Sequence, residues 1–590
     1  MLPVDARAGA TVAALGVAGL VASGTAPWRV LLRGLRRRPL AVLALVSAGL
    51  GALVRRAWGA RTVDADGWLT AVWLGWAASV ALLPVWHLVL PVDGRAGATV
   101  AALGVLGLVA SGATSWRVLG RGLRRHPLAV LAVVAVALWL ANQCLVGPRN
   151  GDSGSYHVPT IRWSAAYPAV PGIANLFAAF AYNQSFFLWA AMLDVGPFLH
   201  RSHHLANGFL VLLLSARVIL GMARAAGPAP CRPADLFFAL VLPGLVGLAF
   251  DLNLTSPSPD VAVFALEAIV AGELLALVAG DRPPRDALYG LALLAGIGVP
   301  VKLSFGGWAV SVPPLALLAV VQREGFRLVP VIVAGVVAAL AVVPWMLHGI
   351  VLSGYPLYPS TLGAAPVDWR APLAATIAEA NLIRYWNGVP DWWHAALRDP
   401  AWFARWLVTL GWLQWDILLP IGLAIVAALT GGVAWCFRRT PRGARAVPVR
   451  IVLPTLAALA FCFAAAPRAR YGAAAYWILA AEVTVIAVGR ASAGVRRALV
   501  AVVLGLASLH LRDHPPLLRD LREFEVYARP DLHEVTLPTG LTVWATGPSL
   551  CCWDGPFPCT PYPNRALRLR RDGDLASGFA IDPTIPPGPP

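Results

Sequence analysis

Residues 286–347 read DALYGLALLAGIGVPVKLSFGGWAVSVPPLALLAVVQREGFRLVPVIVAGVVAALAVVPWML and contain three apolar stretches in succession. We predict helices at 286–303, 305–321 and 327–347. A helix of about 17 to 25 apolar residues crosses the roughly 30 Å hydrocarbon core of a bilayer. Because lipid offers no hydrogen-bond partners, a segment that crosses it must satisfy its own backbone groups. These residues therefore predict three consecutive membrane spans.

Composition extends this prediction to most of the chain. Of 590 residues, 58% are hydrophobic and only 13% are charged, and the mean hydropathy is +0.68. Soluble domains are about a quarter charged, so an ordinary soluble enzyme is excluded. We predict an all-α polytopic membrane protein of about fourteen spans. The predicted spans are 39–56, 68–88, 96–115, 127–147, 205–222, 235–251, 260–279, 286–303, 305–321, 327–347, 415–436, 449–466, 473–489 and 495–511.

The basic residues indicate the orientation of these spans. Arg residues gather in alternate connections, which the positive-inside rule assigns to the cytoplasm. The net charge of +17 therefore needs no nucleic acid partner. The other connections are predicted to lie outside, and they include the loops 148–204, 252–259 and 348–414. The tail from 512 to 590 joins them on the periplasmic or extracellular side.

An internal repeat sets the N-terminus apart from this pattern. Residues 2–45 match residues 90–133 at most positions, with an offset of 88. A close match over one segment indicates a recent duplication, since the repeats of solenoids and transporters pervade the chain. We assign residues 1–38 to a duplicated appendage, residues 39–511 to the membrane domain and residues 512–590 to a C-terminal domain. The charge rule leaves the orientation of the appendage open, and a signal peptide is the alternative.

The first outside loop carries three candidate functional side chains. Asp152 is predicted as a general base or metal ligand, His157 as a proton carrier or metal ligand, and Arg162 as a phosphate clamp. In the alternative interpretation, Asp152 caps a helix that starts near Ser153, and the other two lie on a solvated face.

Further candidates stand at the ends of other spans. Asp260 begins a span, where it caps a helix or faces a polar cavity. Lys302 is the only lysine among 47 basic residues, and it is predicted to bind phosphate or to snorkel to the interface. Arg468 and Arg470 lie in a short outside turn and suggest a site for an anionic lipid or a diphosphate.

The long loop 348–414 is rich in aromatic residues. Tyr355, Tyr358, Asp368 and Trp369 are candidates for contact with a sugar, because aromatic rings stack on sugars. Interfacial anchoring is the alternative for the rings, since Tyr and Trp gather at membrane surfaces.

The C-terminal tail is polar enough to form a small soluble domain. Residues 533–545 are predicted to form a hairpin, and the domain is predicted to be α+β. A disulfide between Cys552 and Cys559 suits an oxidising compartment and supports the outside placement. Zinc is the weaker alternative, because no second Cys/His pair stands at ligand spacing.

Together these segments resemble an uncharacterised family of bacterial multi-pass membrane proteins, similar to the GT-C superfamily of polyprenyl-phosphate-sugar glycosyltransferases. The resemblance runs from about residue 40 to the C-terminus. The segments that carry it are Asp152 with Tyr156-His157, Val170-Pro-Gly with Asn175-Leu, Ser256-Pro-Ser-Pro-Asp260, Val301-Lys-Leu-Ser304, Ser353-Gly-Tyr-Pro-Leu-Tyr-Pro359 with Pro366-Val-Asp-Trp369, and Cys552-Trp-Asp-Gly-Pro-Phe-Pro-Cys559-Thr-Pro-Tyr-Pro563.

The resemblance implies an enzyme of the bacterial inner membrane. It implies that Asp152 acts as base or binds a divalent metal, Mg²⁺ or Mn²⁺, while a lipid-phosphate sugar donor enters from the bilayer and a glycan or lipid accepts the sugar. The loop lacks the second adjacent carboxylate of better-known members, a place that Asp260, Asp368 or Asp391 would have to supply. An envelope lipid or glycan transporter and a non-catalytic assembly protein are the alternative functions.

Overall fold

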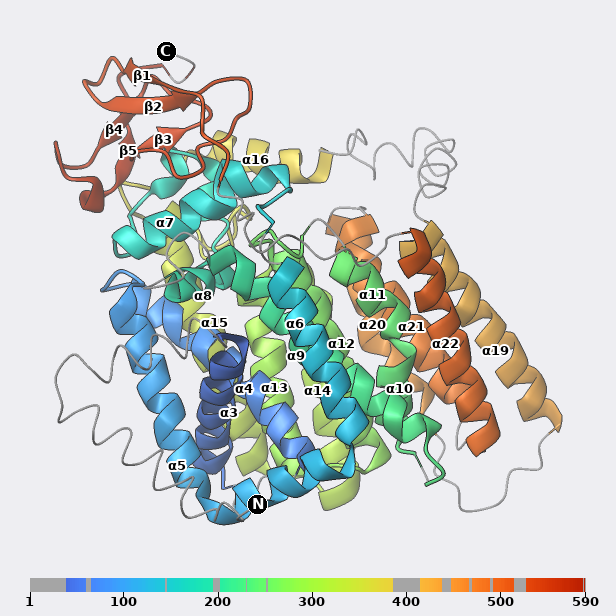
Figure 1. Ribbon diagram of the computed structural model, residues 1–590. Coiled ribbons are helices and arrows are strands. Elements are labelled where there is room, and N and C mark those ends of the chain that lie inside the picture. Colours follow the sequence, from blue (N-terminus) through green and yellow to red (C-terminus); the bar gives the residue numbers. More distant parts are fainter. Residues whose placement is uncertain are drawn as a thin grey trace.

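In the computed structural model, the described residues are 39–59, 65–143, 146–194, 202–229, 231–250, 253–385, 414–437, 447–465, 469–488, 492–513, 527–586 and 588. The predicted appendage, residues 1–38, lies outside them. Long helices form a bundle, and the C-terminal strands lie together at one of its ends (Figure 1). The bundle is built from α3 (Pro39–Ala57), α4 (Ala65–His87), α5 (Gly94–Arg125), α6 (Pro127–Gln143), α9 (Ser202–Ala226), α10 (Pro233–Leu240), α11 (Leu242–Phe250), α12 (Pro259–Ala279), α13 (Pro284–Val301), α14 (Gly306–Glu324), α15 (Leu328–Ser353), α19 (Leu419–Phe437), α20 (Leu453–Ala465), α21 (Ala469–Val488) and α22 (Ala493–Asp513).

The helices confirm the prediction of a polytopic helical membrane protein. Among the described residues, eleven helices are long and apolar enough to cross a membrane, or twelve if the bent pair 117–125 and 127–143 is one span. Every predicted span falls on a helix, but α13, predicted as the span 286–303, is not among these eleven, and α20 is a shorter apolar helix. The count of about fourteen therefore stays a prediction.

One predicted span differs in shape from the expectation. The span expected at 96–115 belongs to α5, which runs on to Arg125 and has a break at Gly112, where φ is 72°. The chain then turns by 93° into α6, which begins with Pro127. Glycine permits the positive φ and proline ends the preceding helix, so both changes have a local cause.

Small residues bring the N-terminal helices into close contact. A Cβ atom added at Gly51 of α3 would lie 1.7 Å from the carbonyl oxygen of Ala71 in α4, and one added at Gly107 of α5 would lie 1.8 Å from that of Gly49. Such close approach of backbones is how membrane helices associate where apolar burial gives little driving force. At the centre of the bundle, 94% of the span in α12 is buried, against 17% of the span in α15.

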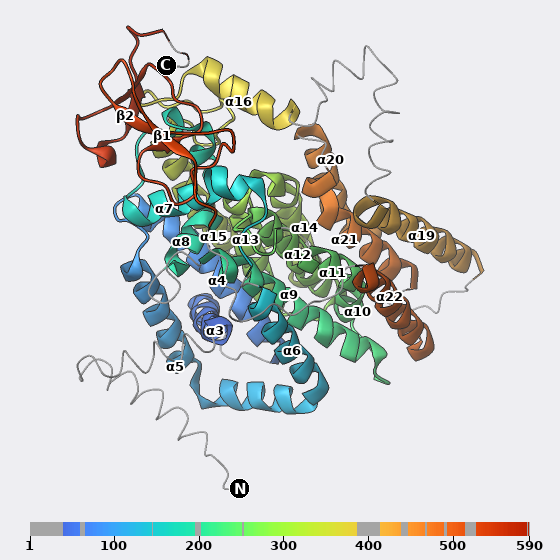
Figure 2. The ribbon, with the colours of Figure 1, turned by 45° about the horizontal axis from the view of Figure 1, so that its top comes forward.

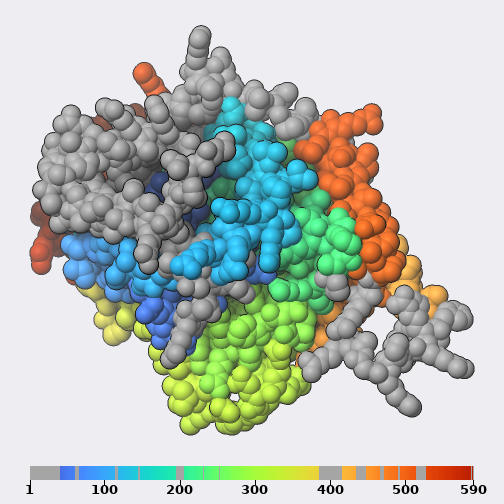
Figure 3. All heavy atoms as spheres, turned by 60° about the horizontal axis from the view of Figure 1, so that its bottom comes forward, coloured from blue at the N-terminus to red at the C-terminus, as the bar shows by residue number. Residues whose placement is uncertain are grey.

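Ion pairs gather at one end of the bundle, which we call the arginine end. Arg55 pairs with Asp286 at 2.5 Å, Arg217 with Glu273 at 2.5 Å, and Arg224 with Asp66 at 2.5 Å. These pairs join α3, α4, α9, α12 and α13. Figure 3, which brings this end forward, shows that segments from much of the sequence reach it. The grouping agrees with the predicted alternation of basic connections.

The opposite end, which we call the loop end, carries an added layer of structure. It contains a π-helical turn Ser153–His157, the helices α7 (Val158–Ala166), α8 (Ser185–Leu193) and α16 (Leu373–Tyr385), and the C-terminal strands. Figures 1 and 2 show the strands beside α7. An apolar core of Trp163, Val170, Tyr355, Val543 and Phe579, among others, joins this layer to the strands.

The C-terminal domain contains two small sheets. The strands are β1 (Leu532–Thr536), β2 (Thr542–Thr546), β3 (Cys559–Thr560), β4 (Leu567–Leu569) and β5 (Phe579–Ile581), with the order β1-β2-β3 in one sheet and β4-β5 in the other. β1 and β2 form the expected antiparallel hairpin, whereas β2 and β3 are parallel. Within 527–586 the structure has strands and one 3₁₀ turn but no α-helix, so this part of the tail is not α+β.

Candidate functional site at the loop end

The loop that holds Asp152 is organised by asparagine. The backbone N–H of Asp152 donates to Oδ1 of Asn150 at 2.9 Å, and Nδ2 of Asn150 donates to Oδ1 of Asn253 at 2.6 Å. Asp152 stands at the start of the π-helical turn but its side chain makes no capping bond there. The capping role proposed for its carboxylate in the alternative interpretation is therefore wrong.

Hydroxyl groups extend this link between the two loops. The Ser153 and Ser256 hydroxyls are hydrogen-bonded, and Nδ1 of His157 lies 3.4 Å from the Ser256 hydroxyl. His157 is only 1% exposed, so it does not lie on a solvated face. On the other side, Nδ2 of Asn207 donates to the carbonyl oxygens of Asn253, Ser256 and Ser258, at 2.6 to 2.9 Å.

Asp260 and Lys302 meet at the end of the same loop. The carboxylate of Asp260 accepts from Nζ of Lys302, and the two side chains are 14% and 15% exposed. The ammonium group also lies 4.6 Å from the centre of the Tyr471 ring, in cation–π contact. Lys302 has extended backbone geometry where α13 ends, so its side chain leaves the helix at this break.

These contacts bring three predicted segments into one row, which we call the outer polar row. It runs from Asp152, Ser153 and His157 through Ser256 to Asp260 and Lys302. The residues are far apart in sequence, and packing against α9 and α12 places them together.

The part of the chain that the structure describes has no ready-made cluster of metal ligands around Asp152. Among the described residues no group of three or more His, Cys, Asp or Glu side chains is placed to hold an ion. Mg²⁺ takes six oxygen ligands, commonly with one or two carboxylates. Close to Asp152 lie instead Asn150 and Cys551, whose Sγ is 3.9 Å from the carbonyl oxygen of Gly151. Burial, together with Asp152, raises the pKa of the Cys551 thiol, which keeps it protonated.

Three other candidates serve as contacts of the C-terminal domain. Arg162, predicted as a phosphate clamp, donates to the carbonyl oxygen of Gly555 and lies over the Phe557 ring at 4.8 Å. Asp368 pairs with Arg570 at 2.9 Å, and Arg570 covers the Trp369 ring at 4.7 Å. These contacts occupy the groups that were expected to bind a substrate, because the tail folds back onto the loops.

The two tyrosines of the long loop lie in the core and not on a sugar-binding surface. Tyr355 is 1% exposed and its hydroxyl donates to the carbonyl oxygen of Ala371, and Tyr358 is 3% exposed. Both rings are therefore closed to stacking with a ligand. Arg468, the side chain of Arg470, and Asp391 lie outside the described residues.

The predicted disulfide is present in the structure. Cys552 and Cys559 are bonded, with Cα atoms 6.0 Å apart. The bond closes a short loop whose residue Trp553 donates its backbone N–H to the carbonyl oxygen of Gly154, at 2.9 Å. The disulfide thus shapes the part of the tail that covers the π-helical turn.

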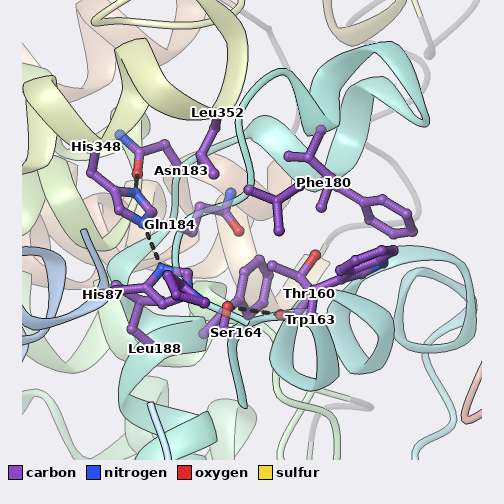
Figure 4. A pocket seen from close by; sticks show the side chains of 14 residues that line it. His87, Thr160, Trp163, Ser164, Phe180, Asn183, Gln184, Leu188, His348 and Leu352 are labelled. Atoms are coloured by element: carbon purple, nitrogen blue, oxygen red, sulfur yellow. Dashed lines mark hydrogen bonds between the residues drawn. The ribbon is translucent and has the colours of Figure 1, made fainter. Parts of the chain in front are cut away.

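Sequence reasoning missed a buried histidine pair at the loop end. Nδ1 of His87 and Nε2 of His348 are 2.7 Å apart, and a cavity of about 30 Å³ lies beside them (Figure 4). The two residues are 261 positions apart, and no local pattern predicts their contact.

It also missed two acidic residues inside the spans. Glu267 of α12 is 1% exposed and Glu482 of α21 is 2% exposed. Among the described residues, one oxygen of each carboxyl group has no hydrogen-bond partner, although Thr455 donates to the other oxygen of Glu482 at 2.7 Å. A carboxyl group in the middle of an apolar span is itself a recognisable signal of function.

A family model for a domain of unknown function, DUF8201, matches residues 40–477. The chain belongs to the DUF8201 family. The DUF8201 match covers the outer polar row and the histidine pair, and ends within α21, before α22 and the C-terminal strands. No curated protein and no solved structure matches the chain.

Proposed function

We propose that the protein is a membrane-embedded glycosyltransferase of the bacterial cell envelope. It would use a polyprenyl-phosphate-linked sugar and transfer the sugar on the outer side of the inner membrane to a glycan or lipid. The observation that carries this proposal is the outer polar row, which joins a carboxylate, a buried histidine and a lysine at one end of the spans. The resemblance of these same segments to GT-C enzymes adds support.

Two groups of the row, Asp152 and Lys302, have chemical roles in the proposed transfer. Asp152 accepts the proton of the acceptor hydroxyl, whose oxygen attacks the anomeric carbon of the sugar. The bond between that carbon and the phosphate oxygen breaks, and polyprenyl phosphate leaves. Lys302 stabilises the phosphate with the N–H donors that Asp260 does not use. The roles proposed for Arg468 and Arg470 beside this phosphate rest on the sequence alone.

Donor consumption by protein in nanodiscs tests this proposal. Radiolabelled polyprenyl-phosphate sugars are supplied with cell-envelope lipid extract as the acceptor, and release of polyprenyl phosphate is measured. We expect Asp152→Asn to lower the rate by at least about 100-fold, as loss of a general base does. Asp93→Asn is the matched control, since Asp93 caps α5 through the backbone N–H of Arg95.

Different outcomes of this experiment test the proposed function and the proposed role of Asp152 separately. No donor consumption by the wild-type protein with any sugar tested contradicts the function. Equal rates for Asp152→Asn and the wild type contradict Asp152 as base. We derive no step through a metal, and rates with EDTA, Mg²⁺ and Mn²⁺ test the metal implied by the resemblance.

A transporter of envelope lipids or glycans is the second candidate, and Glu267 and Glu482 favour it. Carboxyl groups inside membrane spans often mark the path of an ion or a proton. A transporter would move a fluorescent polyprenyl-phosphate sugar across liposomes without consuming it. If the Glu267→Gln variant loses this movement and the Asp152→Asn variant keeps it, the protein is a transporter and not a glycosyltransferase.

A further inference from the structure

A chain of four hydrogen-bonding groups crosses the loop end of the bundle. Nε2 of His87 lies 3.0 Å from the carbonyl oxygen of Tyr167, and its Nδ1 lies 2.7 Å from Nε2 of His348. Nδ1 of His348 lies 2.7 Å from Oδ1 of Asn183. The chain joins α4, α15 and the loop layer, and both histidines are at most 4% exposed.

Both ends of this chain are acceptors. The Tyr167 group is a carbonyl oxygen, so Nε2 of His87 must donate to it. At the other end, Nδ2 of Asn183 donates to the carbonyl oxygen of Trp345 at 2.7 Å, which fixes the orientation of the amide. Rotating the amide would set Oδ1 against that carbonyl oxygen. Oδ1 therefore faces the ring of His348, whose Nδ1 must donate as well.

The number of protons follows from these orientations. Two ring nitrogens donate to the end acceptors, and the short contact between the rings needs one further proton between the two remaining nitrogens. Three protons are required, whereas two neutral imidazoles carry two. We propose that His87 and His348 form a proton-binding site that holds one shared proton more than a neutral pair.

The cavity beside the pair supplies a place for water. Its volume of about 30 Å³ exceeds the roughly 10 to 15 Å³ that one water needs. Two lining residues that Figure 4 labels, Thr160 and Gln184, have buried oxygens, Oγ1 and Oε1, with no hydrogen-bond partner among the described residues. Water bound to these atoms satisfies them and brings a proton carrier to the histidines.

Of the fourteen described residues that line the cavity, only the two histidines carry an ionisable side chain. Other ionisable groups lie behind the lining residues. Tyr182, which precedes Asn183 in the chain, is hydrogen-bonded to Glu379, and the rings of His157 and Tyr156 pack on Phe187 at 5.3 and 6.1 Å. A metal ion does not fit between the rings, because the facing nitrogens are only 2.7 Å apart and each Zn–N bond takes about 2.0 Å.

Loss of the shared proton has a structural consequence. A neutral pair must set two lone pairs against each other at one of the three contacts. That contact then opens: between α4 and the segment that holds Tyr167, between α4 and α15, or between α15 and the segment that holds Asn183. The proton thus stabilises the attachment of the loop layer to the spans.

Solid-state nuclear magnetic resonance of ¹⁵N-histidine protein in lipid bilayers at pH 7 tests the site. The signals of the pair are assigned by subtracting the spectrum of the double variant His87→Gln/His348→Gln. We expect three protonated ring nitrogens in the pair. Two protonated nitrogens would overturn the proposal.

Thermal unfolding against pH gives an independent test. Unfolded histidines titrate near about pH 6.5. If the folded pair keeps its extra proton above that pH, the difference in midpoint between wild type and the double variant shrinks as the pH rises from 7 to 9. A neutral buried pair gives the opposite sign, with a difference that grows as the pH rises. His533→Gln, at an exposed position of β1, is the matched control. If the double variant does not fold, the pH titration of the wild-type nitrogen signals decides between the two.

Discussion

At the residue scale, the ion pair with Asp260 holds Lys302 in place, and Lys302 is the group that we propose binds the phosphate. Both side chains are mostly buried, and the ammonium group also contacts the Tyr471 ring. Arg occupies every other basic position, but its planar fork differs in shape from a compact ammonium. At position 302 a compact ammonium group therefore contacts the Asp260 carboxylate and the Tyr471 ring at the same time.

Removing one member of this pair is expected to cost more than removing both. Lys302→Met takes the cation away from a buried carboxylate, which we expect to cost about 2 kcal/mol, between the values for exposed and for fully buried pairs. Lys302→Met/Asp260→Asn removes the charge as well and should recover part of that loss. Thermal unfolding in nanodiscs measures both. A double variant less stable than each single variant would show that the charges are not coupled.

At the element scale, the π-helical turn Ser153–His157 is the surface on which the tail rests. A Cβ atom added at Gly154 would lie 2.4 Å from the Trp553 ring, whereas nothing lies within 4 Å of one added at Gly151. Trp553 has a positive φ of 44° and stacks on Tyr527 with ring centres 5.7 Å apart. Glycine at 154 thus lets the indole ring sit directly on the backbone.

Gly154→Ala is expected to loosen the C-terminal domain. The methyl group must displace Trp553, and such overpacking costs about 1 to 3 kcal/mol. Limited proteolysis should cut the tail of this variant sooner than that of the wild type. Gly151→Ala is the matched control, one turn away in open space, and should behave as the wild type does. Equal protection of all three proteins would contradict the contact.

At the scale of the whole molecule, charge is divided between the two ends of the bundle. The arginine end holds the paired Arg residues, and the loop end holds the outer polar row and the disulfide-bonded tail. The positive-inside rule assigns the arginine end to the cytoplasm. On this assignment the disulfide lies in an oxidising compartment, where such bonds persist.

Labelling of intact cells tests this orientation. A membrane-impermeant maleimide applied after an impermeant reductant should label Cys552 and Cys559 without permeabilising the inner membrane. Cys552→Ser/Cys559→Ser is the control for labelling of other thiols. Label that appears only after the inner membrane is opened would place the tail in the cytoplasm and would remove the basis for transfer on the outer side.

Much of the fold follows from local properties of the chain. Apolar length predicts the spans, and the β1–β2 hairpin is readable from alternation and its turn. The site was predictable only in part. Lys302 stood out because it interrupts an apolar run, and Asp152 because it follows a span. The burial of Tyr355 and Tyr358 was not predictable, because the sequence does not distinguish an aromatic loop residue on the surface from one in a core.

Local stretches of apolar and basic residues determined the order of the spans and the charge at their two ends. Each apolar segment is solvated by lipid independently of the others, so these features can be predicted one segment at a time. The pairing of Asp260 with Lys302, the diversion of Arg162 to the tail and the contact of His87 with His348 depended on tertiary packing. These contacts join residues 42, 393 and 261 positions apart. Hydrogen bonds reach only about 3 Å, so such partners are decided by how the helices and the tail pack together.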